Sequence, residues 1–355
     1  MGSAASAKIL TVTPQNFDTV YKNVQAKDVL QMTGVFDDLK LTSRSFAAPV
    51  MIDATNAQFT GTISLWGIDN LKFSGGTFRI AGGPIYTKAV AVYGGSNITF
   101  DKAVVYGSAG ESGIIFTGTT NATVSNSVFH GLRSGIGFSA VNRGLATKNK
   151  IYEADSDGID IADSHFVKAT YNSCTNGNPG PGVHADCIQL FSLAGHPIQS
   201  DITISNNTAI GPTQGFTSFA NGGGGLRLHI INNVVATSQP QGIACYDCID
   251  SDISYNRVTT LPGSLYQTNV NVIGGSGNTV VGNFIGKKPA PAKAAAALRN
   301  ISAFDPSAIA PGLIAAGSAA DVPEPSAWTM LVFGFGAIGS ALRRRAAGDA
   351  VMRMA

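Results

Sequence analysis

The chain has 355 residues, of which 42 are glycine and only 13% are charged, and its formal net charge is +2. A charge so close to neutral provides no basic footprint for DNA or RNA, so we expect no nucleic-acid partner. Few charges together with many Gly, Asn, Thr, Ser, Val and Ile residues favour a β-rich protein with many turns. The four cysteines are too few to indicate a disulfide framework, and we expect them to pack in the core or to form one local disulfide.

Two features are predicted near the N-terminus. Residues 1–7 lack the basic region and apolar run of a signal peptide, yet AASA resembles the end of a cleavage site, so we interpret them as a residual leader or an artificial extension. Residues 13–25 predict a short amphipathic helix with Thr13 as its N-cap and Pro14 at its first position. This helix would cover strand edges that otherwise lack partners.

An asparagine recurs after short β-type runs, at steps of 23, 23, 35, 26, 23 and 27 residues. The recurring residues are Asn126, Asn149, Asn172, Asn207, Asn233, Asn256 and Asn283. A second series begins each apolar run and in four repeats precedes the asparagine by 14 residues; its members are Gly113, Gly135, Gly158, Cys187, Gly215, Gly242 and Asn269. We expect the asparagines to stack as an internal ladder at one corner of the fold.

A repeat period near 23 residues, apolar residues at alternate positions and no helical periodicity indicate a parallel β-solenoid. With the N-terminal helix, the pattern resembles the right-handed parallel β-helix of the pectin lyase-like superfamily. We therefore predict an all-β fold: a right-handed parallel β-helix (solenoid) over residues 8–286, with a short N-terminal capping helix and a C-terminal hydrophobic helix.

The composition changes after residue 286. Residues 287–321 are rich in Ala and Pro and predict a linker. Residues 322–347 contain a Pro-Glu-Pro motif, an apolar run over 328–342 and three arginines, an order that resembles a PEP-CTERM sorting signal; residues 348–355 form a tail. The apolar run is shorter than the roughly 20 residues of a stable membrane span.

The resemblance to a sorting signal implies export in a Gram-negative bacterium, transient insertion in the inner membrane through residues 328–342, and a processing protease acting near Pro323-Glu324-Pro325. We expect the protein at the cell surface or outside the cell. Export also needs an N-terminal signal, so we expect the start of this chain to be truncated.

The stretch DSDGIDIADS, residues 155–164, places four carboxylates on one turn of the solenoid. Alignment of the repeats stacks three of them on residues of the next turn, about 4.8 Å away; the stacked pairs are Asp155 and His184, Asp157 and Asp186, and Asp160 and Gln189. We call these six residues the acidic cluster. Asp160 and Gln189 alternate with apolar residues and should face solvent, whereas Asp163 has no stacking partner and should be ordinary surface charge.

Two considerations favour a catalytic site at the acidic cluster. The 35-residue step from Asn172 to Asn207 is the longest, and its extra loops should wall the binding face. Stacked carboxylates repel one another, so at least one pKa should be raised, and an acid with a raised pKa beside a base suits cleavage of a glycosidic bond.

Two stretches of the acidic cluster resemble the polygalacturonase family. SDGIDIAD is similar to its Asn-Thr-Asp-Gly stretch at Asp157 and Gly158, and HADCIQLF is similar to its Asp-Asp-Cys stretch at Asp186 and Cys187. The resemblance implies that Asp157 and Asp186 flank the scissile bond of a polysaccharide substrate. The chain departs from the family at three positions, with Ala185 in place of an Asp, Gln214 in place of a His and Ala244 in place of an Arg.

Two reactions remain open for such an enzyme. In a hydrolase, Asp157 and Asp186 would act as acid and base, in an undecided order, and Asp160 or His184 would tune them. In a uronate lyase, His184 or Arg227 would remove a proton beside the carboxylate of the sugar.

Further residues are candidates for binding. The predicted substrate contacts are Asp155, Gln189, Gln214 and Arg227, and Ca²⁺, the one cofactor considered, could be held by Asp155, Asp157 and Asp186. Phe216, Phe219 and Tyr246 could form a sugar-stacking platform, which Trp66 and Trp328 should not. The alternative to an enzyme is a non-catalytic protein that binds extracellular polysaccharide at the cell surface or in a biofilm matrix, a role that suits an elongated solenoid.

Overall fold

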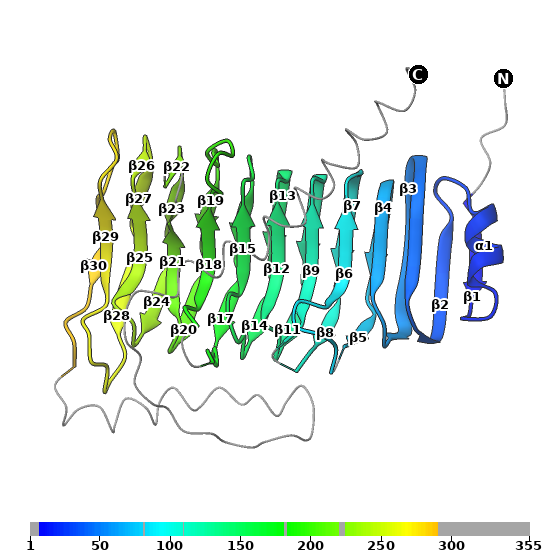
Figure 1. The fold of residues 1–355 in the computed structure, drawn as a ribbon, viewed down its shortest axis with the longest axis horizontal. Helices are drawn as coiled ribbons and strands as arrows, with labels where there is room; N and C mark the ends of the chain where they lie inside the picture. Colours follow the sequence, from blue (N-terminus) through cyan, green and yellow to red (C-terminus); the bar gives the residue numbers. More distant parts are fainter. Residues whose placement is uncertain (1–6, 81, 109, 181–182, 220–223, 290–355) are drawn as a thin grey trace, which may run out of the picture. The chain divides into compact units, whose positions relative to one another are not determined.

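The computed structural model describes residues 7–289, apart from residues 81, 109, 181–182 and 220–223. Within this range the chain forms a right-handed parallel β-solenoid with one short helix, which confirms the predicted fold (Figure 1). Each turn of the solenoid is one rung. Strands of successive rungs pair in parallel and form three faces.

The N-terminal rungs consist of long strands that run from one face into the next. The elements here are β1 (Ile9–Val12), α1 (Phe17–Asn23), β2 (Val29–Phe36), β3 (Leu39–Phe59) and β4 (Ile63–Ser74). The first part of β4 pairs with β6 and its second part with β7, so two of the faces diverge at this strand.

The first face, which we call the site face, carries the acidic cluster. Its strands after β4 are β6 (Lys88–Tyr93), β9 (Ser112–Thr117), β12 (Ser134–Ser139), β15 (Ile159–Ala162), β18 (Asp186–Phe191), β21 (Gln214–Ser218), β25 (Gln241–Tyr246) and β29 (Asn269–Ile273).

The other two faces close each rung. The second contains β7 (Ser96–Asp101), β10 (Thr120–Ser125), β13 (Asn142–Thr147), β16 (Lys168–Thr170), β19 (Thr203–Ser205), β23 (His229–Ile231) and β27 (Asp252–Ser254). The third contains β5 (Thr77–Arg79), β8 (Val104–Tyr106), β11 (Val128–His130), β14 (Lys150–Tyr152), β17 (Ser173–Thr175), β20 (Thr208–Gly211), β24 (Val234–Thr237), β28 (Arg257–Thr260) and β30 (Phe284–Ile285). A separate short pair joins β22 (Gly225–Leu226) to β26 (Cys248–Ile249).

The interior is a continuous apolar column, because alternate residues of each strand point inward. Equivalent phenylalanines of successive rungs stack there: Phe59 lies on Phe78 with ring centroids 4.7 Å apart, and Phe73 lies on Phe100 at 4.8 Å. Each buried phenylalanine contributes about 1.5–3 kcal/mol through the apolar area that it removes from water. This core explains why the strand registers persist from rung to rung.

The N-terminal helix begins later than the sequence predicts. Asn16, not Thr13, occupies the N-cap position of α1, and its Oδ1 accepts a hydrogen bond from the Thr13 backbone N–H at 2.8 Å. The reason is a turn over residues 13–16, which the Asn16 N–H closes on the Thr13 carbonyl. Phe17 of α1 packs edge-on against Phe36 at the N-terminal end of the solenoid (Figure 1).

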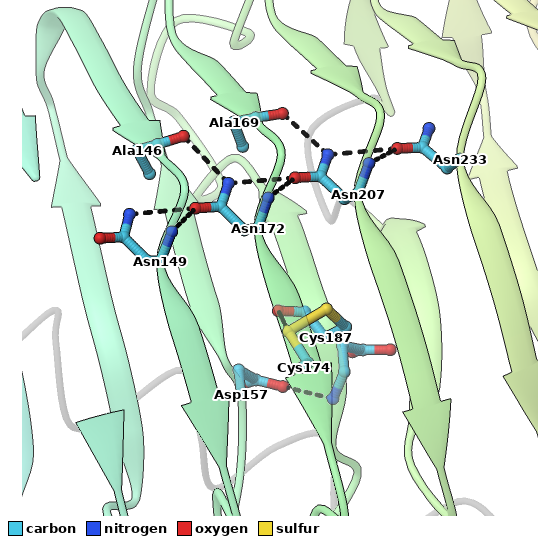
Figure 2. The surroundings of a disulfide bond; sticks show 10 residues. Ala146, Asn149, Asp157, Ala169, Asn172, Cys174, Cys187, Asn207 and Asn233 are labelled. Carbon is cyan, nitrogen blue, oxygen red and sulfur yellow. Dashed lines mark hydrogen bonds between the residues drawn. A yellow bond between two sulfur atoms is a disulfide. The ribbon is translucent and has the colours of Figure 1, made fainter. Parts of the chain in front are cut away.

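The predicted asparagine ladder is present and buried at one corner. Its members are Asn149, Asn172, Asn207, Asn233, Asn256 and Asn283. From Asn172 onward, each Oδ1 accepts bonds from the side-chain amide and the backbone N–H of the preceding member; at Asn172 both come from Asn149, at 3.0 Å (Figure 2). The prediction was wrong for Asn126, since the register of β11 with β14 puts Ser127 opposite Asn149 and leaves Asn126 exposed.

All four cysteines are paired, so the expectation of one local disulfide at most was wrong. Cys245 and Cys248 form the local bond, and Cys174 and Cys187 form a second one. The second bond was not foreseen because its residues are in different strands, β17 and β18. Folding into a rung brings their Cα atoms to 5.5 Å.

The predicted linker and C-terminal hydrophobic helix lie outside the described residues, apart from 287–289. Within the described part of the chain, no helix has the length and apolar character needed to cross a membrane.

Candidate active site

The acidic cluster spans adjacent strands of the site face, in the predicted register. Asp160 of β15 lies opposite Gln189 of β18, and Asp186 lies opposite Gln214 of β21. The neighbours of Asp160 in the strand, Ile159 and Ile161, are fully buried, whereas Asp160 is half-buried and faces outward. Alternation along β15 therefore presents one carboxyl group at the surface.

Asp157 lies beneath this surface and is only 4% exposed. Its Oδ1 accepts a hydrogen bond from the Asp186 N–H at 2.8 Å (Figure 2). Its Oδ2 accepts one from the Ser156 hydroxyl at 3.1 Å. Burial raises the pKa of Asp157 well above its usual range, and the neighbouring carboxylates of Asp160 and Asp186 raise it further. These effects outweigh the two hydrogen bonds, so Asp157 favours the protonated form.

Asp157 and Asp160 are neighbouring carboxyl groups of one rung. Each affects the pKa of the other, and a hydrogen bond between two carboxyl groups requires that one of them is protonated. Burial raises the pKa of Asp160 from 3.8 to about 6, although hydrogen bonds from the Ser134 and Asp157 side chains and the charge of Arg133 oppose the rise. The raised pKa expected for the stacked carboxylates is thus found, in a pair that holds a proton near neutral pH.

His184 and Asp186 form a second pair beside the first. His184 Nδ1 lies 3.3 Å from Asp186 Oδ2, which also accepts a hydrogen bond from Gln189 Nε2 at 3.0 Å. Nε2 of His184 lies 2.5 Å from the amide nitrogen of Gln214. The imidazole of His184 therefore lies between the side-chain amide of Gln214 and the carboxylate of Asp186. The buried carboxylate thereby orients an imidazole whose side chain is 34% exposed.

A family model of the right-handed β-helix region matches residues 57–234, about half of the chain. The chain belongs to this β-helix family. The PEP-CTERM protein-sorting motif matches residues 321–345, within one residue of the predicted start of the sorting signal. No curated protein matches the sequence.

Several solved structures resemble this β-helix. Pectate lyase Pel9A has 13% sequence identity and a TM-score of 0.53, and the alignment covers 81% of this chain and 82% of that one. An alginate lyase from Paenibacillus sp. str. FPU-7 has 14% identity and a TM-score of 0.46, with 79% and 99% covered. PfbA, a surface adhesin of Streptococcus pneumoniae, has 9% identity and a TM-score of 0.48, with 77% and 82% covered. At these identities the likeness concerns the fold.

Asp155 is held by the loop that precedes β18 of the β-helix. Its Oδ1 accepts a hydrogen bond from the Gly180 N–H at 3.1 Å. Burial raises the pKa of Asp155, and the Gly180 N–H and the charge of Arg133 partly offset the rise. The predicted stack of Asp155 on His184 is therefore replaced, in the contacts described, by separate partners: Gly180 for the carboxylate, and Asp186 and Gln214 for the imidazole.

Arg133 is a residue of the site that the sequence prediction missed. It is buried one residue before Ser134, its guanidinium lies 4.9 Å from the ring centre of Tyr86, and its charge lowers the pKa of both Asp155 and Asp160. The sequence contains a signal for this residue. Ser134 occupies the repeat position of Asp157, and the residue before Ser134 is a cation.

Asp163 is not the surface charge that we expected. It is buried, and its Oδ1 accepts a hydrogen bond from the Leu193 N–H at 2.8 Å while its Oδ2 lies 2.6 Å from His196 Nδ1. A backbone φ of 48° turns the chain at Asp163. The carboxylate thus anchors the insertion of residues 192–199 that follows β18.

Arg227 is not brought to the acidic cluster. It lies beyond β22, and its guanidinium contacts the Asp201 carboxylate at 2.7 and 2.6 Å. The hydrogen bonds that Arg227 donates to this carboxylate raise the pKa of Arg227, which is unfavourable for a base. Phe216 is fully buried in the core and cannot stack on a sugar, whereas Phe219 packs 5.6 Å from His184 and 5.2 Å from Tyr246.

The three carboxylates predicted to hold Ca²⁺ already have protein partners. Asp155, Asp157 and Asp186 each accept hydrogen bonds from protein donors. Within the described residues, no three His, Cys, Asp or Glu side chains are grouped closely enough to hold a metal ion. Calcium binding by the acidic cluster stays a prediction.

Proposed function

We propose that this protein is an exported enzyme that cleaves glycosidic bonds in a polysaccharide, with the acidic cluster as its active site. The observation that carries the proposal is the half-buried carboxyl of Asp160, whose pKa is raised to about 6 and whose rung adjoins the one that carries His184 and Asp186. A proton donor and a proton acceptor on adjacent rungs are the two groups that this reaction needs.

In hydrolysis, the pair formed by Asp157 and Asp160 donates its proton to the glycosidic oxygen as the bond to the anomeric carbon breaks. His184 removes a proton from a water molecule, whose oxygen forms the new bond to that carbon. Asp186 stabilises the imidazolium ion that results, as its carboxylate lies 3.3 Å from Nδ1. Exchange with solvent then returns the proton to the carboxyl pair. In the lyase variant, His184 removes the proton beside a uronate carboxylate instead.

Two further observations support the proposal. The sorting motif at residues 321–345 supports export to the surface of a Gram-negative bacterium, where polysaccharide is at hand. The pectate lyase with the same fold is a precedent for a polysaccharide-active β-helix. The adhesin with the same fold makes non-catalytic polysaccharide binding at the cell surface the second candidate.

The test is to incubate the purified protein with a panel of uronate-containing and neutral polysaccharides. New reducing ends without ultraviolet absorbance indicate hydrolysis, and new absorbance from an unsaturated uronate indicates elimination. Either product must depend on Asp160 and His184, so Asp160→Asn and His184→Gln should remove it. Retained binding without any product would replace the enzyme by the non-catalytic candidate.

A further inference from the structure

An aromatic pair lies on the site face, on rungs that precede the acidic cluster. Trp66 of β4 stacks on Tyr93 of β6 with ring centroids 4.1 Å apart and an interplanar angle of 24°. Leu65 and Val92, the residues just before them, are buried, so both rings point outward. Trp66 is 40% exposed. The pair therefore offers aromatic surface to a ligand.

A lysine without a carboxylate partner accompanies the rings. Lys88 is half-buried, and its Nζ lies 3.5 Å from the Tyr93 hydroxyl and 5.8 Å from the centre of the Tyr93 ring. Among the described residues, no carboxylate lies within ion-pair distance of Lys88. The positive charge of a partly buried ammonium ion is only partly compensated by an aromatic neighbour. An anionic ligand would compensate the remaining charge.

The strand registers connect this pair to the acidic cluster. Tyr93 shares an outward column with small residues of the next rungs; these are Thr117, Ser139 and Ala162. Lys88 begins a second column, through Ser112 and Ser134, that leads to the rung of Asp157. Tyr93 and Lys88, the first residues of the two columns, lie three rungs, or about 14 Å, from the acidic cluster. The side chains between the start and the acidic cluster are small in both of these columns.

A second cation lies along the same path. Arg133 is on the rung before Asp157, where its guanidinium packs over the exposed ring of Tyr86. An acidic chain that runs along the site face therefore meets Lys88, and the positive charge of the buried Arg133 lies farther along the path, before the acidic cluster. This order of charges favours a uronate polymer over a neutral one.

We propose that Trp66, Tyr93 and Lys88 form a second sugar subsite, which binds an acidic residue of the same polysaccharide chain that the acidic cluster cleaves. The apolar face of a pyranose ring packs on the aromatic pair, and its carboxylate pairs with Lys88. The inference rests on the proposed function and adds a substrate class: a uronate-containing polymer long enough to span three rungs.

The test uses two subsite variants and two matched controls. Trp66→Ala and Lys88→Gln change the subsite. Tyr266→Ala removes a similarly exposed ring from the loop before β29, and Lys168→Gln removes an exposed lysine from the second face. Because all four side chains are partly exposed, each variant should fold, which circular dichroism and the melting temperature would verify. KM and kcat are measured with a uronate polymer and with its disaccharide.

We expect Trp66→Ala and Lys88→Gln each to raise KM for the polymer about 3–10-fold, as the loss of an aromatic or cation–π contact predicts. kcat, and KM for the disaccharide, should match the wild type, and both controls should behave as wild type. Unchanged KM values in the two subsite variants of an enzyme that cleaves the polymer would overturn the subsite and leave the proposed function intact. A wild-type enzyme that cleaves only neutral polysaccharides would overturn the acidic substrate class. A wild-type protein that cleaves no polysaccharide would overturn both the second subsite and the proposed function.

Discussion

The asparagine ladder and the acidic cluster are both groups of polar side chains on neighbouring rungs of the solenoid, and they differ in what their side chains can donate. An amide both donates and accepts, so each ladder asparagine satisfies the next at 2.9–3.1 Å without any change in charge. A carboxylate only accepts, so Asp157 and Asp160 can contact each other only by retaining a proton. The asparagine ladder stabilises the fold, whereas the carboxyl pair of Asp157 and Asp160 retains a proton near neutral pH.

The largest expected effect is on catalysis. Asp160→Asn keeps the shape of the side chain but cannot donate the acid proton, so kcat should fall about 10²–10⁴-fold, the range for a general acid. The measurement is the release of reducing ends or of unsaturated uronate at saturating substrate. The matched control is Asp201→Asn, which removes a carboxylate that contacts Arg227 outside the acidic cluster. Equal activity of Asp160→Asn and the wild type would show that Asp160 is not the acid.

The pH profile sharpens the same point. Because the acid must be protonated and the pKa of Asp160 is raised to about 6, kcat/KM should fall about tenfold per pH unit above that value. An initial-rate series from pH 5 to about 8 measures this descending limb. A profile that stays flat through this range would contradict a proton donated by the carboxyl pair.

The ladder should respond in stability. Asn172→Ala removes the acceptor of two Asn149 bonds and the side-chain donor to the Ala146 carbonyl and to Asn207 Oδ1, so the free energy of unfolding should fall by about 2–4 kcal/mol. Asn142→Ala, an exposed position outside the ladder, should change it by less than about 0.5 kcal/mol. Denaturant unfolding compares the two, and similar losses in both would mean that the ladder bonds contribute nothing specific.

The smallest expected effect has the opposite sign. Since the folded-state pKa of Asp160 lies above its ordinary 3.8, the folded protein binds the proton more tightly than the unfolded chain, and stability falls as the pH rises from about 4 through 6. Asp160→Asn should therefore raise the free energy of unfolding at pH 7 by about 1–2 kcal/mol. The gain should vanish below pH 4, where both states are protonated. A lower free energy of unfolding for Asp160→Asn at pH 7 would contradict the unfavourable ionisation of Asp160 in the folded protein.

The parts of the molecule that could be predicted are those that follow from the repeat. Parallel rungs pair residue with residue, so counting along the chain was enough to align Asp160 with Gln189 and Asp186 with Gln214. The same counting failed at Asn126, where the offset to the next rung is one residue shorter and puts Ser127 opposite Asn149.

The missed features depend on how the chain folds between the rungs. Residue spacing does not reveal which way a loop turns, so the burial of Asp163 under residues 192–199 could not be deduced. Cys174 and Cys187 lie in different strands, and their proximity depends on how the chain closes the rung, which the sequence does not reveal. Trp66 was not expected to form a sugar-stacking platform, but it stacks on Tyr93 of the next rung.

The bond between Cys174 and Cys187 links the maturation of the protein to its compartment. Cys187 directly follows Asp186 in β18, so this crosslink holds the strand that carries one side of the acidic cluster. Structural disulfides form in oxidising compartments such as the periplasm and rarely in the reducing cytoplasm. The disulfide of this rung would then form only after the chain has crossed the inner membrane. Under the proposed function, the enzyme would become active away from the cell's own sugar precursors.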